Sequence, residues 1–322
     1  MTIQLARNLV EKDLQDVNHL IHQEISEQHP LVAKITANLL HAGGKQLRPL
    51  IVLLTSKALN YHGDKHIKLA AVLEFFHTAS LLHDDVVDES TLRRGKKTAH
   101  EIWGNQASVL VGDYLFILHH QLLLSLKNLS MLELMADIER RMGYGELVQL
   151  ANKNQAYVST ADYFSIIEAK TSLLFAAAAK LPGILCQIDA QDCEQLFAFG
   201  QHLGNAFQLI DDVLDYCSDP DTIGKNIGDD LADGKSTLPI IHALAQTSEQ
   251  NKTIIIHSLK HGKLDNLAKI IEIVQSANSI EYTREIAQQE AQLAKQALNF
   301  LPDSDYKQAL LAIVDYSIQR DH

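Results

Sequence analysis

Apolar residues recur along most of the chain at intervals of three and four positions rather than in alternation, the spacing that lines one face of an α-helix. Only six prolines occur, and they are widely separated. Clusters of Gly, Pro, Asp, Asn and Lys interrupt the pattern and predict breaks between helices, at 41–49, 60–65, 93–97, 157–163, 218–230, 261–266 and 301–306. No low-complexity linker separates these segments. We therefore predict an all-α protein with a single domain over residues 1–322.

The starts of two helices can be placed from their first residues. Thr160 can cap a helix over TADYFSII, with Asp162 in its first turn, where a negative charge interacts favourably with the helix dipole. Pro239, which follows GKSTL, suits the first turn of another helix, because its missing N–H needs no partner there.

The most apolar segment, 107–126, is long enough to span a membrane. Asp113, His119 and His120 interrupt it, which favours a buried core helix instead. The first residues, MTIQLARNLVEKDLQDV, lack the basic, apolar and small-residue regions of a signal peptide. We expect no transmembrane segment and a cytoplasmic protein.

The composition narrows the class of ligand. Of the 322 residues 46% are hydrophobic and 21% are charged, which is ordinary for a soluble globular protein. The formal net charge of −12 argues against nucleic-acid binding through a general basic surface, so any anionic ligand must meet local cationic groups. The three cysteines, Cys186, Cys193 and Cys217, form no C-x-x-C pair and predict neither a disulfide framework nor a zinc site, which fits a reducing compartment.

An acidic sequence, D-D-x-x-D, occurs twice, at 84–88 and 211–215, each time after an apolar run. On a helix, Asp84 and Asp88 share one face, and so do Asp211 and Asp215. Carboxylates this close repel one another unless cations intervene. Mg²⁺ fits best, because it accepts a few carboxylates and completes its shell with water and phosphate oxygens. A single copy would fit an exposed acidic turn as well as it fits a metal site. Two copies predict a Mg²⁺ site.

Cationic residues accompany both acidic sequences. Guanidinium and ammonium groups fixed in turns, in loops or at a helix exit are typical of diphosphate binding, and enough are present for two diphosphates. The candidates are Lys45 and Arg48 in GGKQLRP, Arg93 and Arg94 after the first motif, Lys170 (beside Thr171) in a turn formed by EAKTS, and Lys225 and Lys235 in GKNIGDDLADGKSTLP. His77 lies on the same helix face as Asp84 and is either a further candidate or an ordinary core histidine.

With these residues assembled, the chain resembles the trans-type polyprenyl diphosphate synthases nearly end to end. The resemblance is carried by GGKQLRP, EFFHTASLLHDDVVDESTLRRG, SVLVGDYL, EAKTS, GNAFQLIDDVLDY and GKNIGDDLADGKSTLP. It implies an isoprenoid synthase fold, an all-α bundle around a deep central cavity, in a homodimer. It also implies that the two acidic motifs face each other at the cavity mouth.

The resemblance further implies a role for each motif residue. Direct ligands of Mg²⁺ would be Asp84, Asp88 and Asp211, supported through water or hydrogen bonds by Asp85, Asp212 and Asp215. The allylic diphosphate would be bound by Arg93, Lys170, Thr171, Gln208 and Lys235. Isopentenyl diphosphate would be bound by Lys45, Arg48, His77 and Arg94. Two departures are visible: Gln46 stands where many relatives have arginine, and Lys96 and Lys97 add charge after Arg94.

The resemblance implies a reaction that is catalysed by electrostatic stabilisation of the leaving group. Cationic groups stabilise the departing allylic diphosphate, the double bond of isopentenyl diphosphate attacks the allylic cation, and loss of a proton gives a new trans double bond. The primer expected is farnesyl diphosphate. The sequence offers no obvious Ser-His-Asp or Cys-His nucleophilic set, and the released diphosphate can take the proton.

The length of the product is suggested by small residues before the first motif. Ala79 and Ser80 lie five and four positions before Asp84, where relatives that stop early carry bulky aromatics. The resemblance is strongest to bacterial members that make a C40 octaprenyl chain, so we expect that product, for a quinone side chain, with at most a transient membrane contact for its release. Phe116 or Leu115 is the candidate for the pocket floor.

Three other functions are consistent with parts of the sequence. A helical phosphohydrolase could use His77, His83 and Asp84, but leaves the second acidic motif unexplained. A class I terpene cyclase shares the first motif but normally has a mixed Asn/Ser/Glu second motif. An inactive partner subunit would have lost aspartates or basic residues, whereas all are present here.

Overall fold

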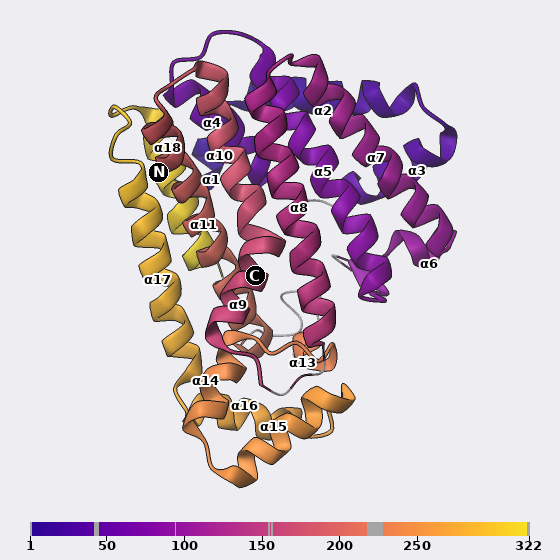
Figure 1. The fold of residues 1–322 in the computed structure, drawn as a ribbon, viewed down its shortest axis with the longest axis vertical. Coiled ribbons are helices and arrows are strands. Elements are labelled where there is room, and N and C mark those ends of the chain that lie inside the picture. The colour runs from indigo at the N-terminus through magenta and orange to yellow at the C-terminus, as the bar shows by residue number, and fades with distance from the viewer. Residues whose placement is uncertain are drawn as a thin grey trace. The chain divides into compact units, whose positions relative to one another are not determined.

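The structure is a computed structural model of the chain. It describes residues 2–41, 45–93, 95–153, 155, 157–217 and 228–320. Helices are by far the main secondary structure of these residues (Figure 1). Within them, the sheet is one short antiparallel hairpin of β1 (Leu92–Arg93) and β2 (Lys96–Lys97). The predicted all-α class is confirmed.

The chain divides into two compact units. The first contains Met1–Ala136, Leu174–Phe197 and Leu298–Ile313, and the second contains Asp137–Leu173, Ala198–Ala297 and Val314–His322. Helices α8 (Leu129–Asn152), α10 (Leu173–Cys186), α11 (Ala190–Cys217) and α18 (Asp305–Gln319) contribute residues to both. The single domain predicted from the sequence stays a prediction.

The first unit is organised around a long buried helix. Its other complete elements, besides the hairpin, are α1 (Ile3–Asn8), α2 (Glu11–Ser26), α3 (Pro30–His41), α4 (Leu47–Ala58), α5 (Lys65–Val87), α6 (Ala99–Trp103) and α7 (Asn105–Ser125). Helix α5 packs against α2, α4 and α7. Because neighbours cover it on several faces, its buried residues form no single stripe, and the run from Leu69 to Leu73 is entirely inaccessible. This packing fixes the end of α5, which carries the first acidic motif.

The second unit contains the remaining helices. They are α9 (Thr160–Ile167), a π-helical turn η1 (Glu168–Ser172), α13 (Asp229–Ala232), α14 (Leu238–Gln246), α15 (Glu249–His261), α16 (Leu267–Ser276) and α17 (Ser279–Ala297). Helix α14 packs against α9, α15, α16 and α17. A buried apolar cluster that includes Tyr163, Leu209 and Leu238 ties α9, α11 and α14 together. The second acidic motif lies in the last turns of α11.

The predicted breaks overlap gaps between the described helices, but those at 41–49 and 157–163 extend too far, because α4 begins at Leu47 and α9 at Thr160. The break at 93–97 is the hairpin, and those at 60–65, 261–266 and 301–306 precede α5, α16 and α18. Pro239 lies in the first turn of α14, as predicted. The expected helix start at 160 is confirmed, but its cap is wrong by one residue: Ser159 accepts the hydrogen bond from the backbone N–H of Asp162.

Two helices in the described part of the chain are long and apolar enough to cross a membrane by length and composition. One is α7, of whose most apolar window 44% is buried, and the other is the continuous helix Thr160–Cys186, with 72% buried. Core helices of globular proteins meet the same criterion, and both of these helices contain buried residues.

Candidate active site

The first acidic motif lies at the C-terminal end of α5. Asp84 is in the last turn and Asp88 is the capping residue, whose backbone N–H donates to the carbonyl of Asp84 at 2.8 Å. Asp84 and Asp88 are partly exposed, whereas Asp85 between them is fully buried. No basic residue lies in this last turn. The predicted helical ladder of Asp84 and Asp88 is therefore present in the structure.

The buried member of the motif holds an arginine. Oδ1 of Asp85 accepts hydrogen bonds from Nε of Arg93 at 2.8 Å and from its terminal NH2 at 2.7 Å, while Oδ2 is buried without a hydrogen-bond partner. Arg93 comes from β1, so the hairpin turns the chain back toward the end of α5. A carboxylate that meets two N–H groups of one guanidinium fixes that guanidinium in place. Asp85 thus orients Arg93.

The second motif repeats this burial pattern at the end of α11. Asp211 and Asp215 are partly exposed, and Asp212 is 2% exposed. Asp212 accepts from the hydroxyl of Tyr163 at 2.5 Å and from the Nε2 amide of Gln208 at 2.9 Å. Burial, helped by the negative charge of Asp230, raises the pKa of Asp212 well above its usual value, while the two hydrogen bonds oppose this.

Residues after α11 add further charge near Asp215. Oδ2 of Asp215 accepts from the backbone N–H of Asp230 at 3.3 Å. Lys235 lies in the loop before α14, as predicted for a loop cation, with Nζ 2.8 Å from Asp233 Oδ2. Asp230 was not among the predicted site residues, although its place in the quoted motif GKNIGDDLADGKSTLP was a signal.

A contact that the sequence did not predict involves the first aspartate of the second motif. Arg320, which follows α18 and is 8% exposed, lies with a terminal NH2 2.7 Å from Asp211 Oδ1. Its guanidinium covers the ring of Phe207 at 3.6 Å from the centroid and donates to the Phe207 carbonyl at 2.5 Å. One cation therefore meets Asp211 in this structure.

Both motifs place carboxylates where a helix disfavours them. A helix C-terminus carries partial negative charge, so each acidic residue in the last turn is destabilising by about 0.3–1 kcal/mol. Asp84 and Asp88 end α5, and Asp215 lies in the last turn of α11, with no basic residue in either last turn. The donor set is all carboxylate, without His or Cys, which suits a hard cation such as Mg²⁺. The residues present fit such an ion.

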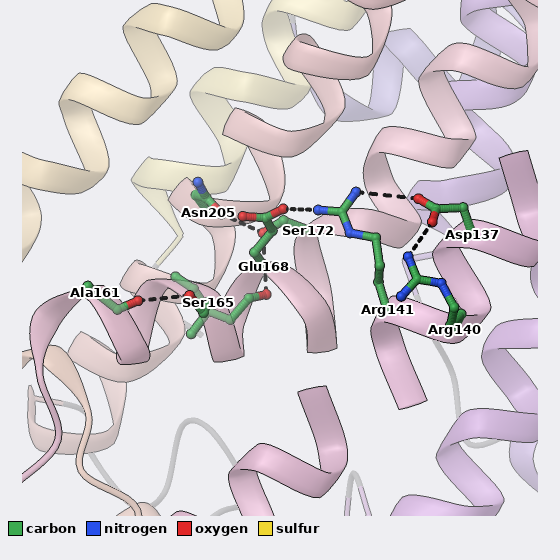
Figure 2. A network of polar contacts seen from close by, with 9 residues as sticks. Asp137, Arg140, Arg141, Ala161, Ser165, Glu168, Ser172 and Asn205 are labelled. Atoms are coloured by element: carbon green, nitrogen blue, oxygen red, sulfur yellow. Dashed lines mark hydrogen bonds and ion pairs between the residues drawn. The ribbon is translucent and has the colours of Figure 1, made fainter. Parts of the chain in front are cut away.

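The segment that carries Lys170 and Thr171 is not the predicted turn. EAKTS, residues 168–172, forms the π-helical turn η1, continuous with α9 before it and α10 after it. Figure 2 shows its polar anchors: Glu168 meets Arg141 of α8, and Ser172 donates to Asn205 of α11 at 2.6 Å. Such single π-turns often occur at functional sites. Lys170 and Thr171 thus lie in a widened helical turn.

Two glycines let neighbouring helices approach this π-turn closely. A Cβ on Gly145 of α8 would lie 2.2 Å from the Cβ of Ala169, and one on Gly204 of α11 would lie 2.4 Å from the Cα of Ser172. Both distances are far below van der Waals contact. The π-turn is therefore packed on two sides against backbone that only glycine can supply.

The predicted side chains of this region meet in the second unit. Thr171 Oγ1 donates to Gln208 Oε1 at 2.9 Å. Nζ of Lys170 lies 3.5 Å from Glu146 Oε2, a partner that the sequence did not indicate. Thr171, Gln208 and Asp212 thus form one hydrogen-bonded group drawn from η1 and α11.

A separate predicted group lies in the first unit. Arg48, which was predicted in a loop, lies in the first turn of α4. Its terminal NH1 is 3.2 Å from Nε2 of His77 on α5, and its guanidinium lies 4.5 Å from the ring centroid of Phe175. Lys45 is exposed, and its carbonyl accepts from Arg7 at 2.7 Å. His77 is therefore no isolated core histidine. Gln46, which replaces the arginine of many relatives, adopts φ +40° and donates to Asn18.

The two predicted chain-length residues lie on α5 above a ring cluster. Ala79 is fully buried, and the hydroxyl of Ser80 donates to the carbonyl of His77 at 2.8 Å. One turn earlier, Phe76 lies 5.5 Å from the ring of Phe116 on α7. Leu115, the other candidate for the pocket floor, is fully buried.

The predicted residues that the structure describes divide between the two units. The first unit holds Lys45, Arg48, His77, Ala79, Ser80, Asp84, Asp85, Asp88 and Arg93, and the second holds Lys170, Thr171, Gln208, Asp211, Asp212, Asp215 and Lys235. Arg94 and Lys225 lie outside the described residues.

Comparison with known proteins gives a consistent result. The family model described as polyprenyl synthetase matches residues 29–276. Octaprenyl diphosphate synthase of Escherichia coli (strain K12) is 39% identical over 322 residues, covering 100% of both chains. All-trans-nonaprenyl-diphosphate synthase (geranyl-diphosphate specific) of Rhodobacter capsulatus is 41% identical over 312 residues, 97% of this chain and 96% of that protein.

Solved structures agree with the sequence relatives. A polyprenyl synthase from Caulobacter crescentus CB15, complexed with calcium and isoprenyl diphosphate, superposes with a TM-score of 0.95 at 36% identity, covering 100% of this chain and 98% of that one. A decaprenyl diphosphate synthase from Rhodobacter capsulatus gives a TM-score of 0.94 at 37% identity, covering 99% of each chain. The predicted resemblance and the isoprenoid synthase fold are confirmed. The chain therefore belongs to the polyprenyl synthetase family and is a chain-elongating trans-prenyltransferase.

Proposed function

We propose that the enzyme adds isopentenyl diphosphate successively to farnesyl diphosphate, in the presence of Mg²⁺, to form all-trans octaprenyl diphosphate (C40) for a quinone side chain. The observation that carries the proposal is the full-length identity of 39% to an octaprenyl diphosphate synthase. The matching burial pattern of the two acidic motifs supports the metal-dependent chemistry. Relatives named for nonaprenyl and decaprenyl products make chain length the part to be tested first.

The metal ligands in this proposal are the partly exposed aspartates. Asp84, Asp88 and Asp211 would hold Mg²⁺, with Asp215 supporting it through water. When bound, the ion draws negative charge from the departing diphosphate. The calcium and isoprenyl diphosphate in the Caulobacter crescentus relative support a divalent cation beside a prenyl diphosphate. The buried aspartates serve a different purpose: Asp85 orients Arg93, and Asp212 orients Gln208.

Cationic side chains bind the allylic diphosphate. Arg93, Lys170 and Lys235 donate to its oxygens and lower the energy of the leaving group as charge develops on it. Arg93 is already oriented by Asp85, so it needs little rearrangement when substrate binds. The oxygens of Thr171 and Gln208 lie 2.9 Å apart and present the negative ends of their dipoles to the developing allylic cation.

A second set binds isopentenyl diphosphate. Arg48 is held by His77 and by the ring of Phe175, which leaves its charge in a defined position for the diphosphate. Lys45 and Arg94 complete this set in the proposal. The diphosphate released from the allylic substrate accepts the proton that is lost after condensation, so no protein base is required.

The proposed path of the growing chain runs along α5 and α7 in the first unit. Ala79 and Ser80 are small, which leaves room for a prenyl tail beside Asp84. Phe76 and Phe116 lie one turn beyond and are in ring contact, so they are suited to limit the tail. An apolar path also keeps water from the allylic cation.

We extend the proposal to a cytoplasmic homodimer. On α7, Leu110, Ile117 and Leu124 are 66%, 53% and 56% exposed. They are seven residues apart, which is about two helical turns, so they form an apolar stripe on one face of the helix. An apolar stripe of this kind favours burial against a second copy. The three free cysteines are consistent with a reducing compartment.

The test is to incubate the purified protein with Mg²⁺, labelled isopentenyl diphosphate and farnesyl diphosphate, and to size the dephosphorylated lipids by chromatography. A single C40 product that EDTA abolishes is expected. A shorter or longer single product would retain the chemistry and reject the octaprenyl assignment. Hydrolysis of the primer without condensation would point to a phosphohydrolase, and an intact primer without elongation to an inactive partner.

The same assay tests the chain-length residues. Ser80→Phe places a ring beside the proposed path, and we expect a product several isoprene units shorter with condensation retained. Ser125→Phe at the far end of α7 provides a control outside the proposed path. An unchanged product from Ser80→Phe would reject this path.

A further inference from the structure

Tyr163 is a buried titratable residue that no motif includes. It lies on α9, is 4% exposed, and packs in the apolar cluster with Leu209 and Leu238. Its hydroxyl donates to Oδ2 of Asp212 at 2.5 Å, across 49 positions of sequence. A buried phenol requires a hydrogen-bond partner, but an apolar core position could have been filled by phenylalanine without one.

The contact begins an unbroken series of hydrogen bonds. Asp212 accepts from Tyr163 through Oδ2 and from the Nε2 amide of Gln208, at 2.9 Å, through Oδ1. Gln208 in turn accepts from the hydroxyl of Thr171 through Oε1, at 2.9 Å. The series runs from α9 through α11 to the π-turn. It ends at the two side-chain oxygens that the proposed function places beside the allylic cation.

The series determines which way the Gln208 amide faces. Asp212 accepts from Tyr163 on one oxygen and from Gln208 on the other, so the NH2 end of the amide meets Asp212 and the amide oxygen meets Thr171. A flipped amide would set its oxygen against a carboxylate oxygen and its NH2 group against the position that the allylic cation takes. Tyr163 anchors the carboxylate by its other oxygen and so prevents Asp212 from rotating away.

We propose that Tyr163 is a positioning residue for the condensation reaction: through Asp212 it fixes the Gln208 amide with its oxygen beside Thr171. The proposal rests on the proposed function, in which these two oxygens stabilise the allylic cation. It assigns the buried Asp212 to orientation, since protein donors occupy both of its oxygens. An ordinary core tyrosine would contribute stability alone, whereas a positioning residue contributes to kcat.

The kinetic test compares Tyr163→Phe with Tyr282→Phe. Tyr282 packs on the same apolar cluster and stacks on His242, so it controls for removal of a phenol hydroxyl from this region. We expect Tyr163→Phe to lower kcat about tenfold, equivalent to about 1.4 kcal/mol, with the KM of both diphosphates unchanged. Tyr282→Phe should leave kcat unchanged. A wild-type kcat in Tyr163→Phe would overturn the proposal.

A double-mutant cycle tests whether Tyr163 acts through Gln208. In the Gln208→Ala background there is no amide to orient, so Tyr163→Phe should cause no further loss of kcat. If the two losses multiply, Tyr163 does not act through Gln208 and the proposal is wrong.

A spectroscopic test is independent of activity. In protein labelled with ¹⁵N-glutamine, the side-chain amide signal of Gln208 is identified by its loss in Gln208→Ala. Tyr163→Phe should broaden this signal and speed its hydrogen exchange, and Asp212→Asn should do the same if Tyr163→Phe does not fold. An unchanged signal would reject the positioning role. A changed signal with unchanged kcat would retain the orientation of Gln208 and instead reject its proposed part in catalysis.

Discussion

At the scale of single residues, each acidic motif divides its aspartates by burial. Asp84 and Asp88 are partly exposed at the end of α5, as Asp211 and Asp215 are on α11, while Asp85 and Asp212 are buried and bonded to protein donors. The spacing in the sequence predicted which aspartates share a helix face. It could not identify the donors, because Tyr163 lies 49 positions from Asp212 and outside every motif.

The exposed aspartates are the ones expected to control the rate. Asp84→Ala and Asp211→Ala should each lower kcat by about 10²–10³-fold, because Mg²⁺ can no longer be held beside the leaving diphosphate. Asp303→Ala is the control, since that side chain is 93% exposed and pairs with Lys307 away from the motifs. Steady-state kinetics at saturating Mg²⁺ measure the effect, and near-normal turnover in either variant would contradict the metal assignment.

Arg320 is expected to compete with the metal. Its guanidinium is 2.7 Å from Asp211 Oδ1, and a positive charge there opposes a second cation. We expect Arg320→Gln to lower the Mg²⁺ concentration for half-maximal activity about two- to tenfold, and to lower the melting temperature, because the Phe207 contacts are lost. Arg140→Gln, in an exposed pair with Asp137, should change neither. An increased Mg²⁺ requirement in Arg320→Gln would show that the arginine supports the site.

At the scale of elements, the π-turn is the feature that sequence reasoning described wrongly. EAKTS contains no Gly or Pro, and the predicted turn at its Lys and Thr is wrong. An i→i+5 turn within a continuous helix depends on what packs around it, here α8 through Gly145 and α11 through Gly204. These partners come from distant parts of the chain, so the local sequence alone does not determine the widened turn.

A pair of glycines two positions apart on α8 tests this packing. Gly145→Ala would push against the Cβ of Ala169, so we expect about 1–3 kcal/mol of destabilisation and a clear fall in kcat as Lys170 and Thr171 move. Gly143→Ala meets nothing within 4 Å and should stabilise α8 by about 0.5–1 kcal/mol, with kcat unchanged. Chemical denaturation and steady-state kinetics measure both. Equal behaviour of the two variants would mean that the close approach at Gly145 is unimportant.

At the scale of the whole molecule, the helical class and most breaks followed from the sequence. Apolar residues spaced by three and four produce buried faces in α2 and α16, and Gly- and Pro-rich stretches fall between helices. The spacing does not show how helices distant in sequence associate, which is why Arg320 and Glu146 were missed. Most of the predicted site residues came from the family motifs, because each motif is a short continuous stretch that can be recognised in the sequence.

The apolar stripe on α7 gives a prediction for the assembly. Ile117→Glu introduces a charge in the centre of the stripe, and we expect the molecular mass in solution to fall from that of a dimer to that of a monomer. Leu5→Glu on α1 is a matched control, because Leu5 and Ile117 are both 53% exposed. Light scattering after size-exclusion chromatography measures the mass. A dimer that persists in Ile117→Glu would exclude this stripe as its interface.

The aspartates at the ends of α5 and α11 also link folding to the supply of metal. Acidic residues weaken the C-terminal end of a helix, so a cation that binds these carboxylates only in the folded state stabilises that state by mass action. The melting temperature should therefore rise with Mg²⁺ concentration, and the rise should be smaller in Asp84→Asn. In a cell, magnesium would then act on this enzyme twice, as a participant in turnover and as a determinant of how long each molecule survives.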